Sequence, residues 1–397
     1  MQMQTLKNGI PVILDPRPTE AAVIEVQINV GSNHENKKQA GMTHLIEHML
    51  FEGTTTRTAQ QISNAIESVG GEFNAATTQE RTFYYIYIPK QHLTTAINIM
   101  ADIIKNPTFD QAILKKEKNV VLNEILVVND DPKQYQWVIF LNTLFTKHEA
   151  KNPVSGNAEA IKKMTREDIL AYYTKYYTPA NMTISLTGNI GDPLQLLNST
   201  FGAIPTKSSM KEFMTEEPLQ TTPRRKKVKM NVEHSYLTMG YHAPPKGHKD
   251  YYTLEVIRSI LGRGQSSRLF EEIRTKRGIA YMVGCLYDAS YSFGAFASYV
   301  STEKKNLEEA KKVLREAFHL KDLTDQEVED AKQYLLGSFI LHKEDNKERT
   351  DMNAEWSLLR KDPMHYLPAI QRVTKKDVLE AAKKYFHQNP TEVLLQK

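Results

Sequence analysis

The chain has 397 residues, of which 40% are hydrophobic and 25% are charged, so it can form two or three domains with an ample core. Its net charge of +4 is far from the strongly basic surface of a nucleic-acid-binding protein. A single cysteine, Cys285, excludes an internal disulfide and suits a reducing compartment. No apolar run approaches the roughly 20 residues of a membrane span, and the N-terminus has no signal-peptide core. We therefore expect a cytoplasmic protein that binds neither nucleic acid nor membrane.

The first half begins with a predicted strand over Val23–Val30, followed by the segment GMTHLIEHMLF at residues 41–51, which contains H-x-x-E-H. On a helix, His44 and His48 lie about 40° apart and one turn apart, so their imidazoles can bind one metal ion. Glu47 projects on the same side and can reach a water molecule on that metal. This combination describes a zinc hydrolase. Two helical histidines can also be plain surface or core residues, so a third ligand has to decide.

Further along, residues 70–89 start with a Gly-Gly turn and continue into alternating strand formers, which predicts a strand over Thr82–Ile88. An amphipathic helix is expected over Gln91–Ile104. The polar start of the 70–89 segment, taken by itself, is equally typical of an ordinary internal strand and of a strand that contacts a ligand.

A further helix is predicted after Pro107, over residues 108–125, and it carries Glu117 and Glu124. Seven residues bring both carboxylates to nearly the same face, about 10 Å apart along the axis, so one ion cannot easily take both as ligands. One would bind the metal, and the other would support a histidine or hold a substrate group. Glu117 lies among lysines and could instead be a solvated charge. That alternative is weaker for Glu124, whose neighbours are apolar.

The chain also repeats itself weakly. Residues 165–186 resemble residues 374–395, each with a capping threonine, a helix, an aromatic pair and a terminal strand. At the offset of 215 that aligns the upstream helices, Glu124 falls on Phe339, and the second half has no H-x-x-E-H. Only the first half can hold this zinc site.

Strands and helices do not alternate steadily, which favours an α+β fold with two related domains, each a mainly antiparallel sheet with helices on one face. We expect a zinc-binding domain over residues 1–205, a linker over 206–224 and a second domain over 225–397. The linker is predicted because this segment is polar, contains proline and has no periodicity.

The sequence resembles the pitrilysin and insulinase family of zinc metallopeptidases, the inverzincins, and in length it is similar to the short two-domain members such as the mitochondrial processing peptidase subunits. In that family the third ligand is the second glutamate of an E-x6-E pair about 75 residues beyond the second histidine. Glu124 lies 76 residues after His48 and forms such a pair with Glu117. The resemblance implies that His44, His48 and Glu124 bind one Zn²⁺ per chain, that Glu47 is the general base and that Glu117 supports a ligand.

Asn74, Ala75 and Thr77 match the family's active-site edge strand, which in relatives accepts the substrate peptide as an added strand. Backbone hydrogen bonds then give affinity with little sequence preference. The resemblance therefore implies that these three residues bind substrate.

In the second half, residues 262–284 match a family segment in which an arginine precedes a tyrosine by seven residues; here these are Arg274 and Tyr281. In relatives this pair reaches the scissile peptide, where it can hydrogen-bond carbonyls and stabilise the developing oxyanion. The alternatives are that Arg274 is one more cation at a helix end and that Tyr281 is a core aromatic of a strand.

The resemblance as a whole implies a zinc-dependent endopeptidase that hydrolyses peptides or unfolded segments inside a chamber. Longer relatives close that chamber with four domains in one chain, so this chain would need a second subunit. A homodimer with an active site shared between chains is the economical choice. Two alternatives stay open: a catalytic subunit that needs a paralogous partner, and a non-catalytic assembly or scaffold subunit.

Overall fold

The computed structural model of the chain describes residues 1–206, 215–386 and 389–397. Among these, the chain divides into two compact units. Unit 1 comprises residues 1–126, 153–206 and 342–363, and unit 2 comprises the remaining described residues. Each unit therefore includes a segment from the other half of the sequence.

The predicted linker falls partly outside the described residues, because residues 207–214 are among those not described. Its last residue, Arg224, is the first residue of strand β7 (Arg224–Lys229). The expected domain limits, 1–205 and 225–397, stay predictions.

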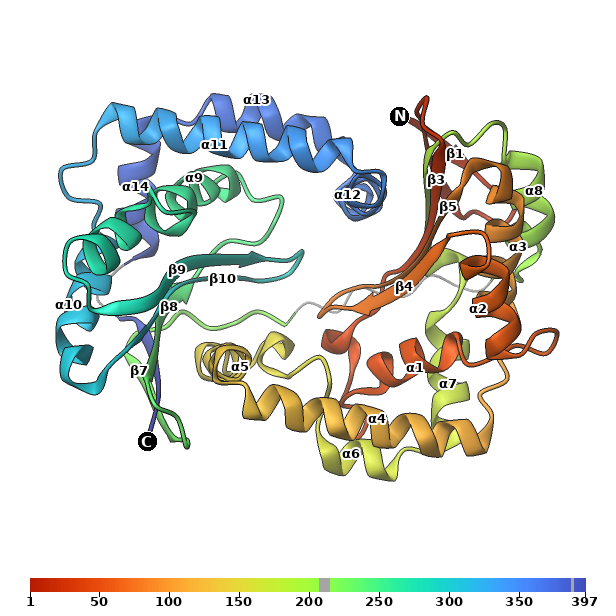
Figure 1. Cartoon of the computed structure of the whole chain (residues 1–397), viewed down its shortest axis with the longest axis horizontal. Coiled ribbons are helices and arrows are strands. Elements are labelled where there is room, and N and C mark those ends of the chain that lie inside the picture. Colours follow the sequence, from red (N-terminus) through yellow and green to blue (C-terminus); the bar gives the residue numbers. More distant parts are fainter. Residues whose placement is uncertain (207–214, 387–388) are drawn as a thin grey trace. The chain divides into compact units, whose positions relative to one another are not determined.

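Unit 1 is built on a six-stranded sheet with the order β1-β2-β6-β3-β5-β4, of which Figure 1 labels β1, β3, β5 and β4. The strands are β1 (Gln2–Thr5), β2 (Pro11–Pro16), β3 (Ala21–Ile28), β4 (Glu72–Thr77), β5 (Thr82–Pro89) and β6 (Met182–Gly188). Neighbouring strands are antiparallel except β2 and β6, which run parallel. Strand β4 therefore forms one edge of the sheet.

Helices of the first half cover one face of this sheet and form its apolar core. They are α1 (Met42–Leu50), α2 (Ala59–Glu67), α3 (Leu93–Lys105), α4 (Gln111–Asp130), α6 (Ala158–Lys163), α7 (Arg166–Tyr176) and α8 (Leu194–Thr200). On β3, Ile24, Val26 and Ile28 point into this core. Because side chains alternate along a strand, Glu25 and Gln27 point to the opposite face.

The opposite face of the same sheet is covered by α12 (Asn346–Leu358), and this contact is polar. The guanidinium of Arg349 donates to the buried carboxylate of Asp15 at 3.0 Å, and the Asn353 amide donates to the same carboxylate at 3.0 Å. Arg81 pairs with Asp351 at 2.5 Å. Ion pairs to the buried side chains of Asp15 and Arg81 thus hold α12 against the sheet of unit 1, although the helix comes from the C-terminal half of the chain.

Unit 2 has a five-stranded sheet with the order β7-β11-β8-β10-β9. Its further strands are β8 (Ser235–His242), β9 (Ala280–Ala289), β10 (Gly294–Thr302) and β11 (Thr391–Gln396). Its helices are α5 (Pro132–Leu144), α9 (Tyr251–Gly262), α10 (Leu307–Ala317), α11 (Asp325–Glu344), α13 (Tyr366–Gln371) and α14 (Lys375–Tyr385). The last residues of α11 belong to unit 1. Helix α5 comes from the first half and packs Phe140 and Leu144 against Val393 and Leu395 of β11.

The two sheets are related in strand order. Strands β2-β6-β3-β5-β4 of unit 1 correspond to β7-β11-β8-β10-β9 of unit 2, and in each the first pair is parallel while the rest are antiparallel. This confirms the predicted α+β class with two related, mainly antiparallel halves. At the sequence offset of 215, Glu124 corresponds to Phe339 of α11, whose ring stacks on Tyr366 with centroids 5.0 Å apart.

Within the described part of the chain, no helix combines the length and the apolarity that are needed to cross a bilayer.

Candidate metal centre

Helix α1 presents the H-x-x-E-H segment because its other face is apolar. Leu45, Ile46, Met49 and Leu50 are 0–1% exposed and belong to the core of unit 1. The helix is therefore held by burial on that side, and His44, Glu47 and His48 lie half-buried on the remaining face.

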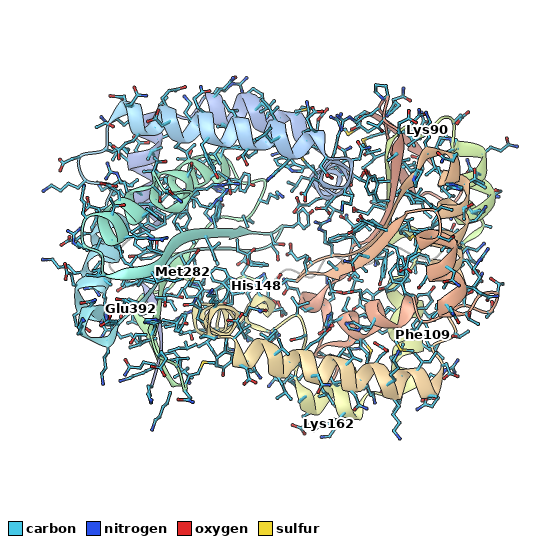
Figure 2. All side chains as sticks on the ribbon, in the orientation of Figure 1. Lys90, Phe109, His148, Lys162, Met282 and Glu392 are labelled. Atoms are coloured by element: carbon cyan, nitrogen blue, oxygen red, sulfur yellow. The ribbon has the colours of Figure 1, made fainter. Side chains whose placement is uncertain are left out.

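Helix α4 carries the two glutamates and is fixed at its start. Phe109, labelled in Figure 2, adopts φ 45°, is 1% exposed and packs edge-on against Tyr173 at 5.1 Å. The carboxylate of Asp110 then accepts the backbone N–H groups of Ala112 and Ile113 at 2.8 and 3.1 Å, which caps the helix.

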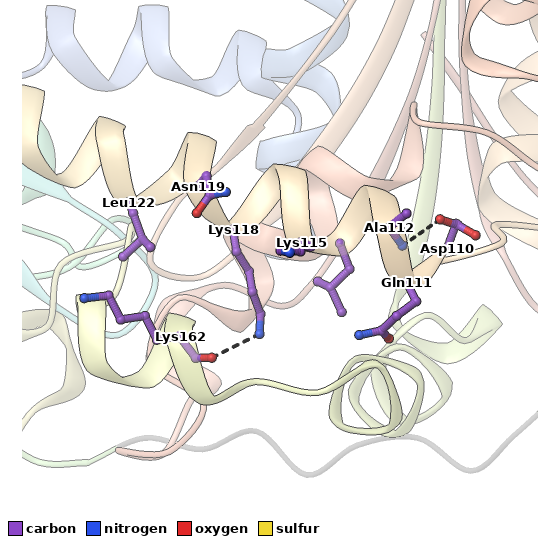
Figure 3. Close-up of a pocket in the computed structure, with 9 residues that line it drawn as sticks. Asp110, Gln111, Ala112, Lys115, Lys118, Asn119, Leu122 and Lys162 are labelled. Carbon is purple, nitrogen blue, oxygen red and sulfur yellow. Dashed lines mark hydrogen bonds between the residues drawn. The ribbon is translucent and has the colours of Figure 1, made fainter.

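A second contact holds the outer side of α4. Lys118 donates to the carbonyl of Lys162 at 3.2 Å and to that of Met164, both at the C-terminal end of α6, where a cation is favourable (Figure 3). A surface pocket of about 640 Å³ lies along this contact, next to Lys115 and Leu122. Its lining residues include none of the predicted site residues, so this pocket is separate from the metal centre.

The structure brings His44, His48 and Glu124 together. The Oε2 atom of Glu124 lies 3.7 Å from Nε2 of His44 and 3.5 Å from Nε2 of His48. One ligand atom from each residue falls within 4.8 Å of the others, and within the described residues this is the one group of its kind. Two imidazole nitrogens and a carboxylate oxygen converging on one point fit a tetrahedral Zn²⁺ with one position open.

Burial prepares His44 for that role. It lowers the pKa of His44 to about 4, with a further contribution from the nearby His48. The imidazole is therefore neutral at pH 7, which is the form that binds a metal.

Glu117 is buried, at 5% exposure, and contacts His48 instead of solvent. Its Oε2 atom lies 3.2 Å from Nδ1 of His48. When the Nδ1–H group of His48 donates a hydrogen bond to Glu117, Nε2 of the same ring carries the lone pair. This lone pair faces Glu124 and the candidate metal position. This geometry contradicts the alternative of a solvated surface charge and is the usual arrangement behind a metal-binding histidine.

Glu47 is held from the side by strand β4. The hydroxyl of Thr77 donates to Oε2 of Glu47 at 2.6 Å. Burial raises the pKa of Glu47, while the Thr77 hydrogen bond and His48 oppose that shift. A carboxylate with a raised pKa beside a metal position is suited to take up and return a proton.

Asn74, Ala75 and Thr77 lie on β4, which pairs with β5 and forms the edge of the sheet. The alternative of an internal strand is therefore wrong. Asn74 is exposed, whereas the Thr77 hydroxyl is directed to Glu47. That these residues bind substrate stays a prediction.

Arg274 and Tyr281 belong to unit 2 and lie side by side there. Arg274 lies near the end of a short π-helical turn (Phe270–Thr275), and its guanidinium is 4.8 Å from the centre of the Phe270 ring and 5.7 Å from that of Tyr281. Tyr281, on β9, is 77% exposed, so the alternative of a core aromatic is wrong. A role of this pair in catalysis stays a prediction.

Two features of the site were not predicted. One is the hydrogen bond from Thr77 to Glu47, and the other is Glu35, whose buried carboxylate contacts the start of α1. A glutamate six residues before the glycine that opens a helix gives no periodic signal, so sequence patterns alone could not identify it.

Residues 12–158 match the family model of insulinase, peptidase family M16, and residues 163–335 match the model of the peptidase M16 inactive domain. An uncharacterized zinc protease of Bacillus subtilis (strain 168) is 32% identical, with 89% of this chain and 87% of the relative covered. An uncharacterized zinc protease of Rickettsia felis is 30% identical, with 98% and 96% covered.

Solved structures show the same fold. A protease from Helicobacter pylori superposes with a TM-score of 0.95 at 22% identity, over 100% of this chain and 99% of that one. A structure from Pseudomonas fluorescens described as a peptidase M16 inactive domain gives a TM-score of 0.92 at 20% identity, over 100% and 97%. At these identities the likeness concerns the fold alone.

Proposed function

We propose, from the premise that this chain belongs to the insulinase family of peptidases (M16), that it is a zinc-dependent endopeptidase that acts on peptides or unfolded segments. The observation that carries the proposal is the convergence of His44, His48 and Glu124 around one point, with Glu47 beside them. Close relatives in sequence are named zinc proteases.

Each of these side chains has a distinct task. His44, His48 and Glu124 would hold one Zn²⁺, which when bound polarises a scissile carbonyl and acidifies a water molecule. Glu47 takes the proton of the attacking water and later delivers it to the leaving amine. Glu117 keeps His48 in the tautomer and orientation that the metal needs.

Substrate would bind along β4. As an edge strand, β4 can pair its free backbone groups with an extended peptide. That peptide would lie close to Glu47, because Thr77 of β4 donates a hydrogen bond to Glu47. Asn74 and Ala75 are the residues along which we expect the peptide to lie. Such binding reads the backbone and favours unstructured segments over folded proteins.

The second part of the active site would come from a second subunit. Arg274 and Tyr281 have the chemistry to hold a substrate carbonyl and its developing negative charge, and Tyr281 is exposed. We propose a homodimer in which the zinc site of one chain works with this pair from the other, enclosing a chamber. The cytoplasm is the proposed location.

The two alternative functions are a catalytic subunit that needs a paralogous partner and a non-catalytic scaffold. They differ in whether they require an intact metal centre. The second half matches the inactive-domain model and, at the sequence offset of 215, has Phe339 where the first half has Glu124, so the proposed metal site belongs to the first half. In the first half, all the predicted metal ligands converge. A non-catalytic scaffold does not need that convergence, whereas a catalytic subunit with a paralogous partner would show the same geometry.

The test uses the purified chain without any added partner. Metal analysis should find one zinc per chain, and a set of unstructured peptides should be cleaved. A chelator should abolish cleavage, and added Zn²⁺ should restore it. A folded chain that binds zinc but cleaves only after a paralogue is added would favour the heterodimer, and one that binds no zinc and cleaves nothing would favour the scaffold.

A further inference from the structure

The carboxylate of Glu35 is placed at the N-terminus of α1, the helix that carries His44, Glu47 and His48. Its Oε2 atom accepts the backbone N–H of Gly41 at 2.7 Å, and its Oε1 atom accepts the backbone N–H of Thr43 at 2.7 Å. Glu35 is only 8% exposed, so both bonds are formed away from bulk water. Thr43 is the residue directly before His44.

Helix α1 has no cap of its own at this end. The residue in the capping position is Gly41, which offers no side chain and has φ 95°. A side chain there would also collide with the carbonyl of Ser155 and the side chain of Ile161, each 2.7 Å from an added Cβ atom. The N–H groups of Gly41 and Thr43 therefore depend on a residue from outside the helix.

The segment before Glu35 connects this cap to the strand that holds the base. Gly31 packs against the carbonyl of Thr78, and the backbone N–H groups of Ser32 and Asn33 donate to the carbonyls of Thr78 and Gln79 at 3.2 and 2.7 Å. Thr78 follows Thr77, the last residue of β4 and the donor to Glu47. The same short turn therefore ties the end of β4 to the start of α1.

We infer that Glu35 is a positioning residue of the metal centre, which sets the position and rotation of α1 so that His44 and His48 meet Glu124 while Glu47 stays beside Thr77. This inference rests on the proposed function. Glu35 acts through the helix and touches neither the candidate metal position nor substrate.

The test substitutes Glu35→Gln, which keeps the size of the side chain but directs an amide N–H₂ at one of the two backbone donors. We expect zinc affinity, measured by competition with a chelator, to fall 10–100-fold, as for other residues that orient ligands. At saturating Zn²⁺, kcat should fall while KM changes less than twofold. The visible absorption of the Co²⁺-substituted protein, which reports ligand geometry, should also change.

Thr58→Ala is the matched control, because Thr58 caps the neighbouring helix α2 in the same unit by accepting the N–H of Gln61 at 3.2 Å. It should lower the unfolding midpoint, as a lost cap does, and leave zinc affinity, kcat and the Co²⁺ spectrum unchanged. If Glu35→Gln does not fold, Glu35→Asp replaces it; this variant keeps the carboxyl group but is too short for both bonds, and a smaller change in the same direction is expected.

A folded Glu35→Gln protein with wild-type zinc affinity and Co²⁺ spectrum would overturn the inference. So would a Thr58→Ala control with the same loss of zinc affinity, because the effect would then follow from stability alone. Failure of the proposed function is distinguishable, since in that case the wild-type chain itself would bind no zinc or cleave no peptide.

Discussion

The hydrogen bond between Glu117 and His48 connects a buried carboxylate to the ring nitrogen that faces away from the candidate metal position. Glu117→Gln should therefore keep the fold and lower zinc affinity and kcat/KM by 10–100-fold, because the amide orients His48 less strongly and makes its ring less basic. Chelator competition and peptide hydrolysis measure both effects. Lys115→Gln, a change on the outer side of the same helix, is the control. Full zinc affinity and full activity in Glu117→Gln would reduce Glu117 to a structural residue.

At the level of single residues, helical spacing could predict His44, Glu47 and His48 and place Glu124 and Glu117 on one face. Spacing left the role of Glu117 open, because its lysine neighbours favour solvent and only the packing of α4 on α1 buries it. Glu35 was not predictable, since its partners are backbone N–H groups that no side-chain pattern reveals.

At the level of elements, the strands and helices predicted from periodicity are present within a few residues of their expected limits, such as β3 at Ala21–Ile28 and α3 at Leu93–Lys105. The exchange of α5 and α12 between the halves was not predictable. Both helices have long-range partners, and the polar face that α12 shows to Asp15 resembles an ordinary solvated surface in sequence.

Part of the predicted linker is held in place by hydrogen bonds that Glu217 accepts from residues 146–148. Burial opposes ionisation of Glu217, but the N–H groups of His148, Thr146 and Lys147, at 2.8–2.9 Å, prevail and lower its pKa to about 2. Because this value lies below the ordinary value of 4.5, the carboxylate stabilises the fold above pH 4.5, and that contribution is lost as pH falls towards 2.

Glu217→Gln should therefore lower the urea midpoint of unit 2 at pH 7, and the difference from wild type should shrink steadily between pH 4.5 and pH 2. The measurement is urea unfolding at several pH values, monitored by the fluorescence of Trp137 and Trp356. Hydrogen exchange then distinguishes the unfolding of unit 1 from that of unit 2. A Glu217→Gln difference that is the same at pH 7 and pH 3 would show that the charge of Glu217 contributes nothing.

At the level of the whole molecule, the proposed homodimer places the two parts of each active site on different chains. Glu47→Gln and Arg274→Ala should each be nearly inactive alone. In a mixed dimer one site carries both defects and the other carries neither, so random exchange should restore about a quarter of the sites. Tagged chains measure the exchange independently. Confirmed exchange without recovered activity would contradict the shared site and leave the zinc assignment intact.

In the proposed site, α1 supplies two of the three metal ligands and the base, and α4 supplies the third ligand, Glu124. The zinc content and peptide hydrolysis of Glu47→Gln, measured beside those of Glu124→Ala, test this division of roles. Glu47→Gln removes the base and no ligand, so it should keep nearly one zinc per chain and lose hydrolysis. Glu124→Ala removes a ligand and should lose both zinc and hydrolysis. Loss of zinc from Glu47→Gln together with its retention in Glu124→Ala would contradict these roles of the two glutamates.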